Sequence, residues 1–333
     1  MPRHNYFYGL DVLRGLSAIF IVLYHYTVRF NENPITASNA ISWPVSINWG
    51  CAAVTSFFIL SGFLSGKYIK ASRESIFPFL KKRFIRLFPA FFVSVVITSI
   101  VTYLFLPAAF CGIKDILLNF TMVPNLFGAR YVDGAYWTLQ YEWAFYFVVT
   151  IIMLFPWKNI KYIILTLWIV FSIVCNICYD IIPYSGVIST IACTRHSQEF
   201  VIGVSLYYII NNKDYKLPII TSILCIINQI ICQDLVHFIF FMITLIFILI
   251  SVIPSVEIVC QNHLFKPILL ISNISYPLYL IHQMVGFSVL YNVVEITSCR
   301  SWILIIIPIL VVFALAWIIH NYIEVPLSKV LDK

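Results

Sequence analysis

The sequence predicts an all-α membrane protein with about ten transmembrane helices and both chain ends in the cytoplasm. Of its 333 residues, 61% are hydrophobic and only 11% are charged, a composition that excludes an ordinary soluble domain of this length. Apolar runs of about 20 residues, the length that crosses a bilayer as a helix, recur along the whole chain. We therefore predict a single transmembrane domain over residues 1–333.

Ten apolar stretches carry this prediction, and the distribution of Lys and Arg orients them. The stretches lie near residues 9–28, 48–66, 85–107, 137–156, 160–178, 195–211, 217–232, 235–253, 268–290 and 301–323. With the N-terminus in the cytoplasm, fifteen of the 21 Lys and Arg residues fall on the cytoplasmic side, five fall in or beside the opposite loops and one, Arg14, lies in the first span. This asymmetry follows the positive-inside rule, so helix orientation explains the net charge of +7 better than nucleic-acid binding does.

The first predicted span carries polar side chains on one helical face. Arg14 and His25 are eleven residues apart, or about three turns and 20°, so they point the same way about 16 Å apart. Asp11 lies three residues before Arg14, within pairing distance. Because ionisable residues in a span normally face a bundle interior or a water-filled cavity, we predict that this helix lines an active site. His25 is then a general base and Arg14 a ligand for phosphate or carboxylate; a structural ion pair and a core histidine are the alternative.

A basic cluster precedes the third predicted span on the cytoplasmic side. Its four charges are Lys81, Lys82, Arg83 and Arg86. A topogenic cluster that binds anionic lipid explains them. Alternatively, Arg83 and Arg86 clamp the phosphates of a cytosolic cofactor from one helical face. The charge pattern leaves both interpretations open.

Two other predicted spans contain ionisable side chains. Glu142 lies about one and a half turns into the fourth span, and Tyr146 follows it one turn later on the same face. A buried carboxylate has to be paired or protonated, so Glu142 is expected to orient His25, to bind a sugar hydroxyl or to pair with Arg14. The ninth span contains a second intramembrane histidine, His282.

The other noted residues are expected to be structural. Gly62 and Gly66 form a small-xxx-small pattern that allows close helix packing. Arg195 and Glu199 are spaced i, i+4, which predicts a local ion pair. Glu324, at the end of the last span, is expected to bind a cytoplasmic Lys or Arg. The nine cysteines suggest neither a disulfide framework nor a metal site.

Six motifs in a fixed order give the chain a resemblance to a known family. They are LDVLRGLSAIFIVLYH, FFILSGFL, KKRFIRLFPAFF, WTLQYEWAFYF, ISYPLYLIHQ and a closing IEVP. Together they resemble the integral-membrane acyltransferase family 3, the bacterial transmembrane O-acyltransferases. The resemblance implies a ten-helix enzyme that passes an acetyl group from cytosolic acetyl-CoA to a carbohydrate hydroxyl at the outer face.

The same resemblance implies roles for particular residues. It gives catalytic roles to His25, Arg14 and Glu142, binding of the acyl donor to Arg14, Arg83 and Arg86, and substrate binding to Trp137 and His282. Thr138 stands where the family usually has Ser. Whether His25 acts as a base or carries the acetyl group itself is left open.

The resemblance also suggests a biological setting. The size of the chain and its lack of a fused esterase-like domain look most like stand-alone O-antigen acetylases of enteric bacteria and their serotype-converting phages. The expected partners are acetyl-CoA, the bilayer of the bacterial inner membrane and a surface glycan, above all the lipopolysaccharide O-antigen, with neither a metal nor nucleic acid. The competing interpretation is a transporter or flippase of a sugar-lipid or anionic substrate, but the sequence has no inverted repeats or paired broken helices.

Overall fold

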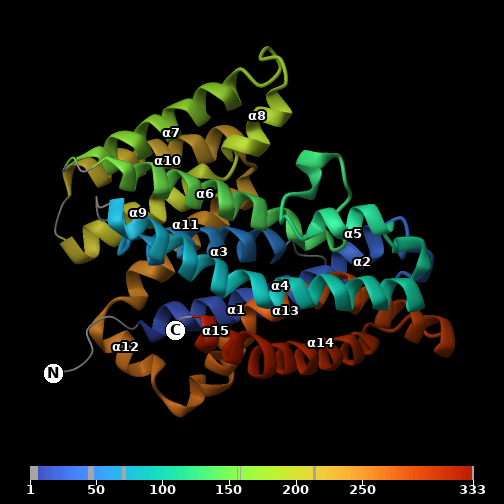
Figure 1. Cartoon of the computed structure of the whole chain (residues 1–333). Helices are drawn as coiled ribbons and strands as arrows, with labels where there is room; N and C mark the ends of the chain where they lie inside the picture. The colour runs from blue at the N-terminus through green and yellow to red at the C-terminus, as the bar shows by residue number, and fades with distance from the viewer. Residues whose placement is uncertain are drawn as a thin grey trace. The chain divides into compact units, whose positions relative to one another are not determined.

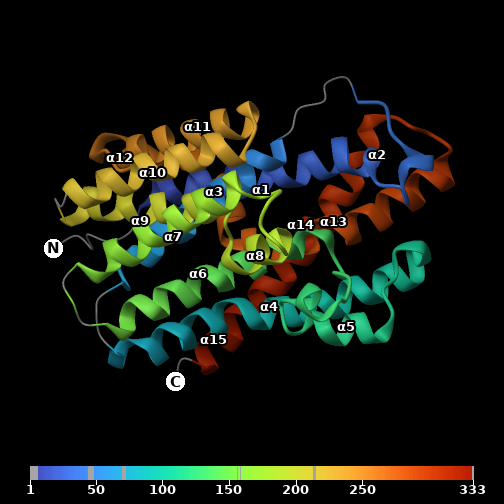
Figure 2. The ribbon, with the colours of Figure 1, turned by 90° about the horizontal axis from the view of Figure 1, so that it is seen from above.

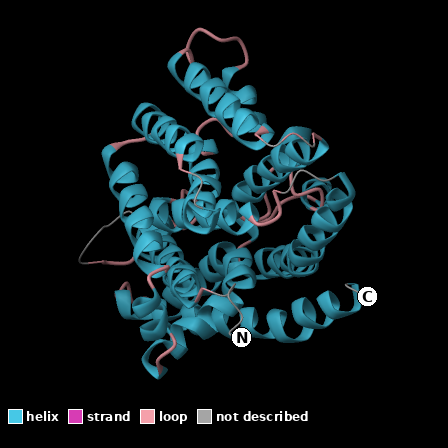
Figure 3. Ribbon diagram, turned by 90° about the vertical axis from the view of Figure 1, so that its left-hand side faces the viewer, coloured by secondary structure: helices cyan, strands magenta, loops and turns pink. Residues whose placement is uncertain are grey.

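The computed structural model describes residues 7–43, 49–69, 73–155, 157, 159–212 and 215–331. Within these ranges the chain forms helices joined by loops, and no β-strand (Figure 3). The all-α prediction is therefore confirmed for this part of the chain.

Each of the ten predicted spans coincides with one helix of 14 residues or more. These helices are α1 (Tyr8–Tyr24), α3 (Trp49–Gly66), α4 (Ile76–Phe105), α6 (Trp137–Leu154), α7 (Ile160–Ile177), α9 (Ser197–Asn212), α10 (Lys216–Cys232), α11 (Leu235–Ser251), α13 (Lys266–Thr297) and α14 (Ile306–Ile319). Two of them extend several residues beyond the predicted spans: α4 begins at Ile76, before the basic cluster, and α13 continues to Thr297. Charged ends lower the local hydropathy but do not interrupt the helix.

Five helical stretches among the described residues are long and apolar enough to cross a membrane. They are Tyr8–Glu32, Arg73–Phe105, Ile160–Ile177, His263–Thr297 and Trp302–Leu331. A sixth is possible only if α11 and α12 (Pro254–Cys260), which meet at an angle of 94°, form one broken span. The chain is thus a multi-pass membrane protein, and the full count of ten spans and the cytoplasmic position of both ends stay predictions.

Short helical elements connect the long helices. They include η1 (His25–Arg29), α2 (Phe30–Glu32), α5 (Ile113–Asn119), η6 (Gly134–Tyr136), α8 (Ser185–Ala192), η9 (His320–Glu324) and α15 (Val325–Leu331). Two of them are π-helical: η1 continues α1, and η9 continues α14. Single π-helical turns within α-helices are rare and often lie at functional sites. His25 is the first residue of such a turn.

The chain divides into two compact units. Unit 1 comprises residues 1–53, 83–139 and 250–333, and unit 2 comprises residues 54–82 and 140–249. Among the predicted site residues, unit 1 contains Arg14, His25, Arg83, Arg86, Trp137 and His282, whereas unit 2 contains Glu142.

In unit 1, α13 lies beside both α1 and α14 (Figure 1). Helices α1 and α13 approach closely because Gly15 has no side chain: a Cβ there would overlap the carbonyl oxygen of Ile268. The connection that contains α5 lies beside the second half of α4 (Figures 1 and 2), where Phe92 and Phe120 stack with ring centroids 4.6 Å apart. Tyr276 on α13 also bonds to α4, and Phe91 on α4 contacts Tyr136 of η6, so α1, α4, α13 and η6 share one core.

In unit 2, α10 packs against both α7 and α9. Helix α3 approaches α9 through the predicted small residues: a Cβ on Gly62 would overlap the carbonyl oxygen of Phe200, and one on Gly66 would overlap the Tyr207 ring. The prediction of close packing at Gly62 and Gly66 is confirmed.

Candidate active site

Two histidines from opposite ends of the sequence meet in unit 1. His25, at the start of η1, and His282, in the middle of α13, have exposed fractions of 8% and 0%. Nε2 of His282 lies 3.1 Å from Nδ1 of His25, and the two rings are nearly perpendicular with centroids 4.6 Å apart. The sequence predicted a role for each residue but gave no sign that they touch.

Backbone carbonyls fix the tautomers of both rings. Nδ1 of His282 lies 2.7 Å from the carbonyl oxygen of Tyr279, and Nδ1 of His25 lies 2.9 Å from that of Ile21. Because a carbonyl oxygen only accepts, each Nδ1 carries a hydrogen. Neutral His282 then accepts, at its own Nε2, the hydrogen on Nδ1 of His25. The unprotonated, basic nitrogen of His25 is therefore its Nε2. The pair therefore holds the His25 ring with a defined nitrogen available for chemistry.

Close contacts around His282 support this pair. The Tyr26 hydroxyl donates to the carbonyl oxygen of His282 at 2.7 Å. Tyr26 fits there only because position 286 is glycine, since a Cβ on Gly286 would overlap the phenol oxygen. The Gln283 side chain also interacts with the His25 ring. Tyr26 and Gly286 were not identified from the sequence, because nothing in an apolar span indicates which tyrosine faces which glycine.

A buried carboxylate ties the loop before α6 to α13. Asp133 is fully buried, and its two oxygens accept N–H bonds from Ala135 and Met284, both 2.8 Å long. Burial raises the pKa of Asp133 to about 7, against these two hydrogen bonds, which lower it. Met284, whose N–H donates to Asp133, is two residues from His282. This bond therefore holds the loop before α6 close to the histidine pair.

Thr138 links the start of α6 to α13 through its hydroxyl. The Tyr279 hydroxyl donates to the carbonyl oxygen of Ala135 at 2.9 Å, and Thr138 Oγ1 lies 2.8 Å from the Tyr279 oxygen. Thr138 therefore joins the start of α6 to the helix that contains His282. The neighbouring Trp137 is half-buried at the first position of α6.

Arg14 forms the local pair that the spacing predicted. Its Nη1 lies 2.7 Å from Oδ1 of Asp11, and the two side chains are 21% and 14% exposed. Asp11 also accepts a long bond of 3.4 Å from Ser272 on α13. Arg14 is thus a partly accessible cation on the same helix as His25, and its predicted role in binding the donor stays a prediction.

The two arginines of the basic cluster differ in their environments. Arg83 is buried, with an exposed fraction of 6%, whereas Arg86 is exposed. Arg86 interacts electrostatically with Glu324, whose direct partner is His320 at 2.8 Å. The expected anchor for Glu324 was a Lys or Arg, so the sequence missed the direct histidine partner, although its i, i+4 spacing indicates the pair.

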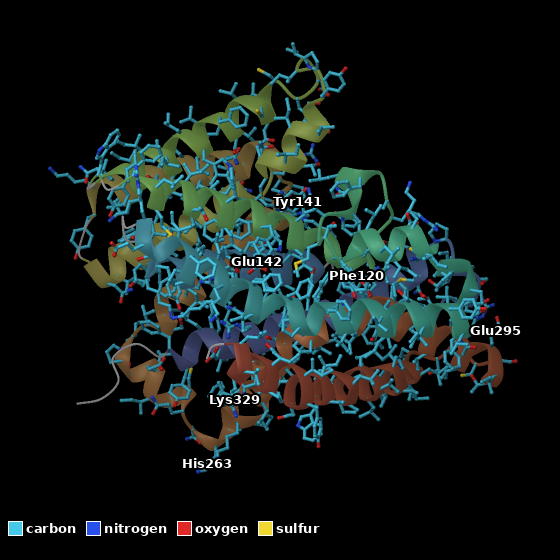
Figure 4. The ribbon with its side chains drawn as sticks, in the orientation of Figure 1. Phe120, Tyr141, Glu142, His263, Glu295 and Lys329 are labelled. Carbon is cyan, nitrogen blue, oxygen red and sulfur yellow. The ribbon has the colours of Figure 1, made fainter. Side chains whose placement is uncertain are left out.

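Glu142 lies in unit 2, on α6 (Figure 4). It accepts hydrogen bonds from the Tyr146 hydroxyl, one turn further along the helix as predicted, and from Ser61 on α3 at 3.4 Å. Its roles as orienter of His25, partner of Arg14 or ligand of a sugar stay predictions.

Glu199 does not pair with Arg195 as the i, i+4 spacing suggested. Instead its Oε2 lies 2.9 Å from Nδ1 of His196, and its Oε1 accepts from Thr55 at 3.1 Å. The Arg195 guanidinium lies over the Tyr179 ring, 4.9 Å from its centroid. The turn before α9 directs the arginine toward the aromatic ring and leaves the i, i+3 histidine to meet the carboxylate.

Comparison with known proteins gives a family match over nearly the whole chain. The model of a family described as acyltransferase domain matches residues 7–323. The O-acetyltransferase OatA of Staphylococcus aureus, strain NCTC 8325 / PS 47, is 26% identical over 372 residues, covering 99% of this chain and 58% of that protein. Nodulation protein 10 of Rhizobium leguminosarum bv. viciae is 26% identical over 172 residues, covering 45% of this chain and 44% of that protein. The chain thus spans little more than half the length of the OatA sequences, and no solved structure matches it.

Proposed function

The chain belongs to the acyltransferase domain family, and from this membership we propose that it is a membrane O-acetyltransferase that moves an acetyl group from cytosolic acetyl-CoA to a hydroxyl of a surface polysaccharide. The favoured acceptor is the lipopolysaccharide O-antigen, in the inner membrane of a bacterium. The name of the relative OatA supports O-acetyl transfer in particular.

The observation that carries the proposal is the His25–His282 pair. Acyl transfer to a hydroxyl needs a base that removes the hydroxyl proton while the oxygen attacks a carbonyl carbon. His25 has the required basic nitrogen at Nε2, and its other nitrogen is held by Ile21 and His282. An imidazole whose tautomer is fixed by a neighbour is the arrangement that acyl-transfer enzymes use to direct their base.

The reaction then proceeds by direct transfer. The acceptor hydroxyl gives its proton to His25 Nε2, and its oxygen forms a bond to the thioester carbonyl carbon. The C–S bond breaks, and the CoA sulfur leaves with the proton that His25 returns. As the imidazolium forms, its Nδ1–H donates to the carbonyl oxygen of Ile21 and to His282, which stabilises the transient charge. A route in which His25 first accepts the acetyl group leaves the same products.

The acyl donor is anionic, and unit 1 contains cations for it. Arg83 and Arg86 flank the start of the apolar part of α4, and Arg14 lies on the helix that ends at His25. Guanidinium groups bind phosphates in bidentate geometry, so these three residues suit the phosphates of CoA. Trp137 and Glu142 are assigned to the acceptor, because indole and carboxylate groups suit a sugar ring and its hydroxyls.

Mass spectrometry of surface glycans tests the proposal. Cells that express the protein should carry acetyl groups on the glycan, and cells without the gene, or with only the His25→Ala protein, should have an intact glycan without them. Loss of the whole glycan on deletion would instead support a transporter or flippase, in which the intramembrane arginines and histidines line a path. An unchanged glycan mass would contradict both functions.

A further inference from the structure

Three buried hydroxyl groups in unit 1 have no hydrogen-bond partner. Ser94 and Thr98 on α4 are both 0% exposed, and Tyr136 at the end of η6 is 1% exposed. None of their oxygens makes a hydrogen bond within the described part of the chain. Buried hydroxyls without a partner are uncommon, because each has given up its bonds to water. Such groups therefore indicate a place where something polar binds.

Neighbouring hydroxyls on the same helix behave in the ordinary way. Ser99 donates to the carbonyl oxygen of Val95 at 2.7 Å, and Thr102 donates to that of Thr98 at 2.8 Å. These i−4 bonds are the usual solution for Ser and Thr inside an apolar helix. Ser94 and Thr98 make no such bond, so their hydroxyls stay free to donate elsewhere.

The three hydroxyls lie together. Ser94 and Thr98 are four residues apart on α4 and share a face. The Tyr136 ring packs on the same face through Phe91, with ring centroids 5.0 Å apart. Its hydroxyl is close enough to Thr98 for the two groups to interact, although neither reaches hydrogen-bond geometry. Three donors thus converge between α4 and the loop that precedes α6.

The hydroxyl cluster and the buried Arg83 lie along one face of α4. Ser94 follows Arg83 by eleven residues, or three turns and about 20°, so the two side chains lie on nearly the same face about 16 Å apart. Thr98 lies about 6 Å further along. Tyr276 on α13 donates to the carbonyl oxygen of Leu87, so this face of α4 is turned toward the helix of His282.

The surroundings favour a neutral acceptor. Phe91 and Val95 are fully buried beside the hydroxyls, and the ionisable group that interacts with Tyr136 is acidic, Asp133. A phosphate there would lack a counter-charge, whereas a carbonyl oxygen needs only a hydroxyl donor. Asp133 lies between this site and the histidine pair: it is three residues before Tyr136, and it accepts a hydrogen bond from Met284, two residues after His282.

We propose that Ser94, Thr98 and Tyr136 form a subsite for the pantetheine arm of the acyl donor and donate to its amide and thioester carbonyl oxygens. The inference rests on the proposed function, which supplies the donor, and adds where its uncharged arm binds. Arg83 holds the phosphates at one end of the α4 face, and the arm runs along this face toward the histidines.

The test compares CoA with 3′-phosphoadenosine 5′-diphosphate, which has the same phosphates without the arm. Binding of both is measured by calorimetry on the full chain in lipid nanodiscs. Ser94→Ala, Thr98→Val and Tyr136→Phe each remove one hydroxyl at nearly constant volume. Each should weaken CoA about fivefold, the usual value of one neutral hydrogen bond, and leave the nucleotide within about twofold.

The helix provides its own controls. Ser99→Ala and Thr102→Val remove hydroxyls that are already bonded within the helix, and they should leave both affinities within about twofold. Arg83→Gln should weaken both ligands, because it acts on the phosphates. The melting temperature of each variant shows that the fold is retained, and removal of an unpaired hydroxyl should not lower it.

Four results would overturn the subsite. Unchanged CoA affinity and unchanged use of the glycan in all three hydroxyl variants would mean that the cluster holds only water. Equal weakening of CoA and the nucleotide would mean a general distortion of α4. Normal CoA affinity with poorer use of the glycan would assign the hydroxyls to the acceptor. If the wild-type protein binds the nucleotide and CoA with equal affinity, the proposed subsite is contradicted, but CoA as the acyl donor is not. If it binds neither ligand, CoA as the donor is contradicted.

Discussion

Two histidines, His25 in unit 1 and the half-buried His196 in unit 2, have different partners. His25 in unit 1 bonds to a carbonyl oxygen of its own helix and to a second histidine. His196 in unit 2 faces the carboxylate of Glu199, which is 1% exposed and also bonds to Thr55. A histidine backed by a carboxylate is the more familiar catalytic arrangement, so this partner alone would favour His196.

The surroundings of His196 indicate a structural role. Glu199 uses both oxygens within unit 2 and thereby links α9 to α3. Beside it, Gln198 on α9 donates to Gln229 and accepts from Asn228, both on α10. Polar networks of this kind hold helices in one packing. The bonds of His25, by contrast, fix the orientation of one ring and leave Nε2 as its base, so the partners of the two histidines indicate different roles.

The largest difference between the two histidines is expected in the transfer activity of their alanine variants, His25→Ala and His196→Ala. His25→Ala should lower acetyl transfer by about 10²- to 10⁴-fold, the usual contribution of a general base, with little effect on insertion. Transfer is measured in membranes with labelled acetyl-CoA and normalised to the amount of protein. Full activity in this variant would rule out His25 both as base and as acyl carrier.

His282 should act through His25, with a smaller effect. His282→Leu removes the acceptor of the His25 Nδ1–H and should lower kcat by about 10- to 100-fold, as loss of an orienting partner does. KM for the donor should change little. His282→Gln places an oxygen near the lost Nε2 and should recover part of the rate. A His282→Leu variant that raises only KM would place this residue in substrate binding instead.

Asp133 should make stability depend on pH. Its pKa of about 7 in the folded protein exceeds the ordinary value of 3.8 for an aspartate, so the folded state retains a proton that the unfolded state loses between these values. Stability should therefore fall as the pH rises from about 4 to 7 and level off above, with a total effect of up to about 4 kcal/mol at about 1.4 kcal/mol per pKa unit.

The Asp133→Asn variant isolates this contribution. It has no proton to lose, so its melting temperature relative to that of the wild type should increase from pH 4.5 to pH 7.5. A constant difference between the two proteins over this range would mean that Asp133 is charged in the folded state throughout, stabilised by its two N–H bonds.

The smallest effect on transfer is expected for His196. His196→Ala should keep acetyl transfer within about threefold of wild type, since its partners tie helices of unit 2 together. It should nevertheless destabilise the protein by about 2–4 kcal/mol, because the buried Glu199 carboxylate loses its partner. A large loss of transfer at normal stability would place His196 in the catalytic machinery and end the contrast with His25.

The sequence by itself determined the helices and the contacts within them. Hydropathy located all ten long helices, because apolar runs of this length have few other stable structures in a membrane. The pairs Asp11–Arg14 and Glu142–Tyr146 follow from helical spacing, since i, i+3 and i, i+4 neighbours meet in any α-helix. The error at Glu199 arose where the helix had not yet begun, because this spacing rule does not hold in a turn.

Only the tertiary structure decided which helix faces meet. His25 and His282 are 257 residues apart, and Asp133 and Met284 are 151 apart, so no local spacing relates them. In a soluble protein the polar face of a helix marks its outside, but here lipid-facing and core-facing surfaces are both apolar, and hydropathy does not distinguish them. The free hydroxyls of Ser94 and Thr98 show the same limit: in sequence they match Ser99 and Thr102, and only packing shows which of them lack a partner.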